Sequence, residues 1–120
     1  MQEILEHLLI HINQIRLFHW KTTSYARHKA TDEYMEKVNP IIDNIIESLQ
    51  GGREKRISNT FTAKYRTIEE NTVMSYLKTE KFWLENIVQG FLDEKETDIL
   101  NMRDEILAAL KRLMYLFTLK

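Results

Sequence analysis

Cysteine is absent from this 120-residue sequence, and proline and glycine are scarce, with one and three copies respectively. Without cysteine there is no disulfide, no thiolate nucleophile and no cysteine-ligated zinc, so any bound metal must use histidine, aspartate or glutamate. So few glycines and prolines argue against a β-sheet, because strands need frequent turn residues between them. The sequence therefore predicts an all-α protein.

Long apolar runs are also missing, and Met1 is followed at once by the polar residues Gln2 and Glu3. The sequence thus predicts neither a transmembrane span nor a signal peptide, and we expect a cytoplasmic protein. The 17 basic and 18 acidic residues nearly cancel, which excludes a general attraction to nucleic acid or to an anionic membrane. A composition of 43% hydrophobic and 29% charged residues is typical of a globular protein, so we expect a single domain over 1–120.

Apolar residues recur at spacings of three and four along four segments, which is the pattern of amphipathic helices. The predicted helices cover about residues 2–22, 28–50, 68–92 and 97–119. Packing their apolar stripes together gives an antiparallel four-helix bundle. The segment 51–66 has no apolar period and is long enough to cross the bundle. We therefore predict one long crossover between the second and third helices, which is the ferritin-like arrangement.

A few residues predict the helix boundaries. Gly51 and Gly52 are expected to stop the second helix, and Thr67 with Glu70 has the form of a capping box at the start of the third. Pro40 falls inside the second helix, where it removes a backbone hydrogen bond and predicts a kink or a division into two helices.

A row of metal-type donors lies on one stripe of the second predicted helix. His28 and Asp32 are four residues apart, as are Asp43 and Glu47, and this spacing puts each pair on one helix face. Asp32 and Asp43 are eleven residues apart, about 16 Å along the axis, so the two pairs cannot bind one ion within one chain. A solvated helix face with ordinary surface pairs is the alternative interpretation.

An antiparallel two-fold pairing of two chains would bring the two pairs together. It lays His28 and Asp32 of one subunit over Asp43 and Glu47 of the other and creates two equivalent sites. His19, near the start of the second helix, would add a third ligand from the first chain. Two imidazoles and three carboxylates suit iron, manganese or zinc, so we expect a metal-binding protein that is at least a homodimer.

A second histidine pair, His7 and His11, lies four residues apart on the first predicted helix. Such a pair can bind a metal, but no carboxylate is obviously assigned to it. We interpret both residues as surface or interface side chains. A metal-dependent hydrolase that uses this pair is a third functional possibility, although the sequence has no nucleophile-activating motif to support it.

The donor row also carries a resemblance. The dipeptide His19-Trp20, the His-x3-Asp of residues 28–32 and the Asp-x3-Glu of residues 43–47, followed by two glycines, resemble the signature of the Dps family of ferritin-like mini-ferritins. The start of the last predicted helix, Thr97 to Leu100, and the aromatic Tyr115 are also similar to that family.

The resemblance implies a ferroxidase centre between two-fold related subunits. It assigns His19, His28 and Asp32 to one subunit and Asp43 and Glu47 to its partner, with Asp32 and Glu47 as the principal carboxylates. Trp20 matches the tryptophan close to the iron in that family. Iron oxidation and storage, protection against oxidative damage and a dodecameric shell are the corresponding expectations.

The sequence also differs from the family pattern. The loop between His19 and His28 is shorter than usual, which predicts a changed orientation of His28 relative to His19. A Lys-rich N-terminal extension is missing, so direct DNA binding is not expected. The basic segment 53–66 could contact phosphates or bases, but a solvated linker is the favoured interpretation.

Two functions of different class therefore follow from the sequence. The first is a Dps-like ferroxidase that oxidises Fe(II) at the shared site with peroxide or oxygen. The alternative is a non-catalytic ferritin-like bundle with a degenerate metal site, which acts as a structural or interaction protein. The fold alone does not decide between them.

Overall fold

The computed structural model describes residues 1–57 and 60–119. Within these ranges it contains helices and no strand, which confirms the all-α class. The four α-helices are α1 (Gln2–Lys21), α2 (Tyr25–Arg53), α3 (Val73–Phe82) and α4 (Thr97–Phe117). They form an elongated body of 45 × 27 × 22 Å.

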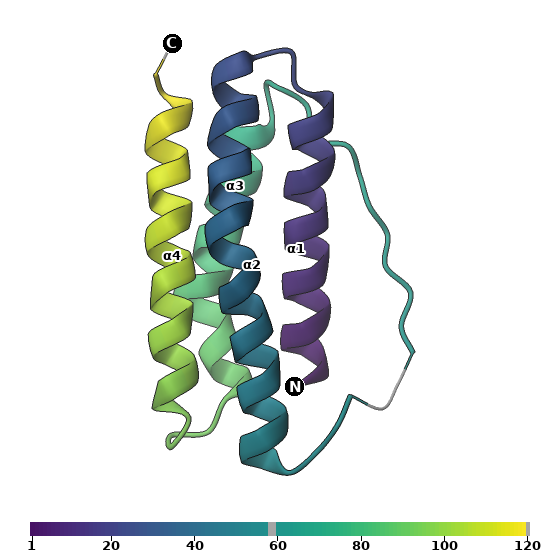
Figure 1. The fold of residues 1–120 in the computed structure, drawn as a ribbon, viewed down its shortest axis with the longest axis vertical. Coiled ribbons are helices and arrows are strands. Elements are labelled where there is room, and N and C mark those ends of the chain that lie inside the picture. Colours follow the sequence, from purple (N-terminus) through teal and green to yellow (C-terminus); the bar gives the residue numbers. More distant parts are fainter. Residues whose placement is uncertain (58–59, 120) are drawn as a thin grey trace.

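The helices alternate in direction with one exception (Figure 1). The chain ascends in α1, descends in α2, and then returns along the outer side of α1 before it descends again in α3, which lies behind α2 in this view. A short turn then leads into the ascending α4, so α2 and α3 run in the same direction. The predicted long crossover between the second and third helices is therefore present.

The crossover is attached to α1 by polar contacts. Gln14 on α1 donates to the carbonyl oxygen of Arg66 at 2.6 Å and accepts from the Arg66 backbone N–H at 2.9 Å. Asn13 donates to the hydroxyl of Tyr65 at 3.0 Å, and Phe61 packs against the core. Part of the basic segment 53–66 therefore contacts the bundle through these side chains and backbone groups. Its residues 58–59 lie outside the described part of the chain.

The second helix is longer than predicted. It begins at Tyr25 because the hydroxyl of Ser24 accepts a hydrogen bond from the Arg27 backbone N–H at 3.2 Å, which is an N-cap. Pro40 does not divide it, and the side chain of Pro40 is exposed. On the solvent side of a helix the carbonyl that loses its partner is open to water, so the cost of the proline is reduced.

The predicted stop at Gly51 and Gly52 is also wrong, because α2 continues through both glycines to Arg53. The helix ends at Glu54, which adopts the left-handed conformation with φ 55°. Arg53 donates to both carboxylate oxygens of Glu96, at 2.9 and 2.7 Å, and to the carbonyl oxygen of Phe91 at 2.9 Å. This link fixes the end of α2 to the turn before α4.

The third predicted helix is shorter and less regular than the apolar pattern indicates. Its α-helical part starts at Val73, so the expected capping box at Thr67 and Glu70 is wrong. It is followed by a π-helical turn, Trp83–Ile87, and a 3₁₀ turn, Val88–Phe91. Through these turns Leu84 and Val88 both remain buried, so the change of pitch keeps the apolar stripe in the core.

Apolar side chains from all four helices fill one continuous core. The fully buried members with the largest side chains include Phe18, Ile4, Ile15, Leu49, Leu77, Ile99, Ile106, Leu110 and Leu113. They recur at helical spacing on each element, and their burial is the main favourable contribution to folding. None of the described helices combines the length and the apolar character that a membrane crossing requires.

Candidate functional site

The turn between α1 and α2 brings His19 and His28 together. His19 lies in the last turn of α1 and is 9% exposed, and His28 lies in the first turn of α2 and is half-buried. Their rings stack at 3.9 Å between centroids with an interplanar angle of 16°. The short loop therefore places the two imidazoles face to face.

Hydrogen bonds define which ring nitrogen carries the proton. The Nδ1 of His19 lies 2.9 Å from both the carbonyl oxygen of His28 and the hydroxyl of Thr31, and the Nδ1 of His28 lies 2.9 Å from the carbonyl oxygen of His19. A carbonyl oxygen only accepts, so each Nδ1 is assigned as the donor. In a neutral ring with this tautomer Nε2 carries the lone pair, and neither Nε2 has a hydrogen-bond partner among the described residues. Neutral imidazoles in this state are the form that binds metals.

The predicted carboxylate ligands lie apart from one another along α2. Asp32, Asp43 and Glu47 are all exposed, and nothing in residues 1–57 and 60–119 forms an ion pair or hydrogen bond with their side chains. In the described part of one chain, histidine and carboxylate side chains form no group of three or more that could hold a metal ion. One chain brings the two imidazoles together but leaves Asp43 and Glu47 about 22 and 28 Å beyond His28 along the helix.

Large aromatic side chains are exposed at the same end of the bundle. Trp20, expected next to the metal, is 69% exposed, and Tyr25 at the start of α2 is 75% exposed. An isolated exposed aromatic needs no explanation, and these two lie within a few residues of the histidine pair in the sequence.

A second polar cluster, which the sequence interpretation missed, lies inside the bundle between α1 and α3. Its centre is Glu80, which is 7% exposed. The Nε2 of His7 lies 3.1 Å from one carboxylate oxygen of Glu80, and the Nδ1 of His11 lies 2.8 Å from the other. Tyr76 lies 3.2 Å from the second oxygen, so three donors surround one carboxylate. We call these residues, together with Tyr34, the Glu80 cluster.

Tyr34 on α2 completes the Glu80 cluster. Its hydroxyl lies 2.8 Å from the Nε2 of His11. When this hydroxyl donates to Nε2, the Nδ1 proton of His11 is available for Glu80. Every buried side-chain nitrogen and oxygen of residues 1–57 and 60–119 then has a hydrogen-bond partner. Burial raises the pKa of both Tyr34 and Tyr76, and the Glu80 carboxylate raises both further. Both phenols therefore act as neutral hydrogen-bonding groups.

Glu80 stays ionised inside the bundle. Burial acts to raise its pKa, but the hydrogen bonds and the charge interactions with His11 and His7 together outweigh burial and lower the pKa to about 2. The indole of Trp83 covers the ring of His7 at 3.7 Å, nearly parallel. The interpretation of His7 and His11 as surface or interface residues is therefore wrong for His11, which is 3% exposed, whereas His7 keeps 29% of its side chain exposed while it contacts Glu80.

A sequence signal for the Glu80 cluster exists. His11 falls on the buried stripe that contains Leu8 and Ile15, and Glu80 falls on the stripe that contains Leu77 and Leu84. A polar residue at a core position must find a partner, and two such positions on neighbouring helices are natural partners for each other.

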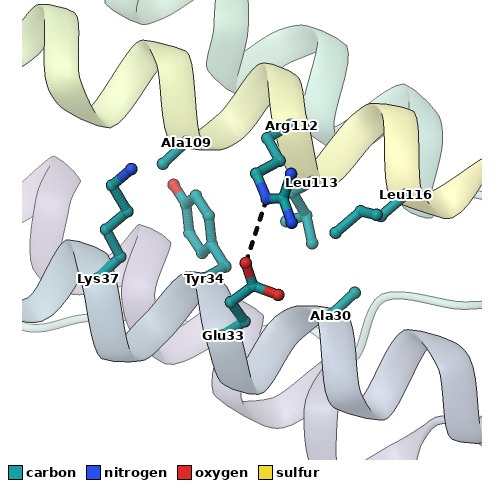
Figure 2. Close-up of a pocket in the computed structure, with 8 residues that line it drawn as sticks. All are labelled: Ala30, Glu33, Tyr34, Lys37, Ala109, Arg112, Leu113 and Leu116. Atoms are coloured by element: carbon teal, nitrogen blue, oxygen red, sulfur yellow. Dashed lines mark hydrogen bonds and ion pairs between the residues drawn. The ribbon is translucent and has the colours of Figure 1, made fainter.

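A small hollow between α2 and α4 does not offer a substrate site (Figure 2). Its volume is about 20 Å³, and Glu33 of α2 reaches across it to Arg112 of α4 at 3.1 Å. A space of this size holds roughly one water molecule. The ion pair engages Glu33 with α4, whereas Asp32, Asp43 and Glu47 form no ion pair within the described residues.

Comparison with known proteins places the chain in a family without assigning an activity. The comparison with curated proteins gives no match, and neither does the comparison with solved structures. Residues 19–117 match the model of a family described as a family of unknown function, DUF5856, and because this match covers most of the chain, the chain belongs to that family.

Proposed function

We propose that two copies of this chain pair along α2 and oxidise Fe(II), their substrate, at two shared sites. The observation that carries the proposal is the protonation pattern of the histidine pair. Both Nδ1 atoms donate to backbone carbonyl oxygens, which leaves the two Nε2 lone pairs for a cation.

The carboxylates supply a second argument. An unpaired row of Asp32, Asp43 and Glu47 on one helix face has no partner in the described part of the chain. In a two-fold antiparallel pairing, His28 faces Glu47 and Asp32 faces Asp43, and both pairs share one midpoint between Lys37 and Val38. A single two-fold axis at that midpoint thus brings each of the four residues opposite its counterpart in the partner subunit.

Each residue has a defined role in this arrangement. His19, His28 and Asp32 of one subunit, with Asp43 and Glu47 of the partner subunit, surround the iron, and the carboxylates offset its positive charge. Asp32 and Glu47 are the principal carboxylate ligands, and Trp20 lines the site. These oxygen and nitrogen donors suit Fe(II), and manganese or zinc could compete for them.

The reaction balances with peroxide as the electron acceptor. Two Fe(II) ions each lose one electron, and one hydrogen peroxide molecule takes both electrons and two protons to become two water molecules. The protein fixes the ligands and controls access, while the redox step belongs to the iron. If the dimers assemble further into a dodecameric shell, the oxidised iron is stored inside it and peroxide is removed, which is a ferritin-like role.

Anaerobic titration with Fe(II) tests the proposal. The parent protein should bind about one to two irons per subunit, because each site holds one or two metal ions and there is one site per subunit. The absorbance of oxidised iron should then increase rapidly after peroxide or air is added. Asp32→Ala and Glu47→Ala should each abolish both events. Glu33→Ala is the matched control, because Glu33 is a neighbouring carboxylate on α2 that faces Arg112 instead.

The alternative function predicts a different result. A non-catalytic bundle with a degenerate site would form a folded dimer or larger assembly that takes up no iron above the level of the two alanine variants. Unchanged iron oxidation in the Asp32→Ala, Glu47→Ala double variant would also reject the proposed residues.

A further inference from the structure

The two ends of α2 carry features that fit each other. At its start, Tyr25 projects into solvent with 75% of its surface exposed. At its end lies a hollow of about 450 Å³, which we call the α2-end hollow, lined by Glu47, Gln50, Gly51, Glu54, Lys55 and Arg56. The hollow is larger than a phenol ring, and both features lie on the helix that carries the candidate iron ligands.

We infer that Tyr25 of each subunit inserts into the α2-end hollow of a second copy of this chain. This inference rests on the proposed function for its register: the midpoint between Lys37 and Val38 places Tyr25 opposite Gln50 of the partner subunit. Gln50 lines the hollow, so the same two-fold axis that assembles the iron ligands brings Tyr25 to the hollow. The register was set by other residues, which makes this coincidence informative.

The chemistry of the hollow suits an aromatic side chain. Lys55 and Arg56 lie on its wall, and their cationic groups are attracted to the face of an aromatic ring. Gly51 and Gly52 leave open space beside them, since nothing lies within 4 Å of a Cβ built at either position. Neither glycine has a positive φ, and glycine lowers helix stability, so neither the backbone conformation nor packing within the chain calls for them. We attribute both glycines to the close approach of a second molecule.

The position of Tyr25 also gives it a role at the iron site. Tyr25 lies three residues before His28 and Gln50 three residues after Glu47, so each is one helical turn outside the facing pair of ligands. A phenol ring seated in the α2-end hollow covers the outer edge of the site and limits its contact with bulk water. Tyr25 is therefore a positioning and shielding residue, because it does not touch the iron.

Site-directed crosslinking tests the inference without iron, since the native chain has no cysteine. Tyr25→Cys and Gln50→Cys are prepared as separate proteins, mixed in the presence of a chelator, and treated with a short bifunctional maleimide. We expect a covalent dimer in the mixture only. Each variant alone should give none, because two copies of either position lie about 37 Å apart along the paired helices.

A substitution series provides a second measurement. Tyr25→Ala should raise the dimer dissociation constant at least tenfold, whereas Tyr25→Phe should leave it within about twofold, as expected when one buried aromatic anchors an interface. Tyr115→Ala is the matched control, because Tyr115 is an exposed aromatic on α4.

The outcomes separate this inference from the proposed function. Iron binding together with an unchanged dimer dissociation constant in Tyr25→Ala overturns the seating of Tyr25 and leaves the ferroxidase proposal in place. A crosslink in the mixture without iron binding supports the docking surface and rejects the ferroxidase. Equal crosslinking in each single variant overturns the register.

Discussion

Replacement of Glu80 by leucine should destabilise the bundle strongly. The change keeps the size of the side chain and removes the only carboxylate that His7, His11 and Tyr76 share. Removing one partner of a buried charge network typically costs about 3–5 kcal/mol, because the remaining polar groups lose their partner. At about 2.1 cal/mol/K per residue, unfolding of a chain of this length has an entropy near 0.25 kcal/mol/K, so the melting temperature should fall by roughly 12–20 °C.

Thermal unfolding followed by circular dichroism measures this effect at neutral pH. Glu85→Gln is the matched control, because Glu85 follows Glu80 on the same segment but is exposed and lies 3.9 Å from Lys81 and Lys111. Such an exposed pair contributes at most about 1 kcal/mol. If Glu80→Leu melts within about 3 °C of the parent, which is under 1 kcal/mol by the same entropy, the Glu80 cluster does not stabilise the fold as described.

The other predictions concern pH, the end of α2 and the histidine pair. The pKa of Glu80 is lowered to about 2 in the folded protein, so its stabilisation is present above the ordinary carboxyl pKa of 4.5. As the pH falls from 4.5 towards 2, the free energy of unfolding should decrease by on the order of 3 kcal/mol through this group. Acid titration of unfolding in the parent and in Glu80→Leu should show this loss only in the parent. Arg53→Ala removes the bidentate contact with Glu96 and should lower the free energy of unfolding, measured by urea titration, by about 1–2 kcal/mol. A change near zero would contradict the link between α2 and the turn before α4. Thr31→Val removes one acceptor of the His19 Nδ1 proton and should weaken Fe(II) affinity about 10- to 100-fold without loss of folding. An unchanged affinity would show that this contact does not orient the His19 imidazole.

The fold class and the order of the helices could be predicted because apolar periodicity reports directly which helix face is buried. The long crossover followed from a segment without such a period. The C-terminal end of α2 could not be predicted, because Gly51 and Gly52 are local signals that tertiary contacts override. The bidentate contact between Arg53 and Glu96 stabilises the last turn of α2. The sequence around Arg53 does not predict this contact, because Glu96 lies 43 residues away.

The candidate site divides in a similar way. The spacing of the donors on α2 could be interpreted from the sequence, since helical geometry alone puts them on one stripe. The stacking of His19 on His28 and their common use of Nδ1 depend on the exact path of residues 22–24, which spacing does not define. The Glu80 cluster was missed because a glutamate and a histidine on polar, charge-rich helices resemble surface residues until their core positions are compared.

Subunit complementation is the most direct test of the shared iron site. One chain carries His28→Ala and Asp32→Ala, the other Asp43→Ala and Glu47→Ala, and the two are co-refolded so that half of the dimers are mixed. Each pure variant should have no ferroxidase activity, because both of its sites lack two ligands. Each mixed dimer contains one intact site, so about one quarter of the parent activity should return at equal subunit concentration. Activity in either pure variant, or none in mixed dimers verified by mass spectrometry, would contradict a site built from two chains.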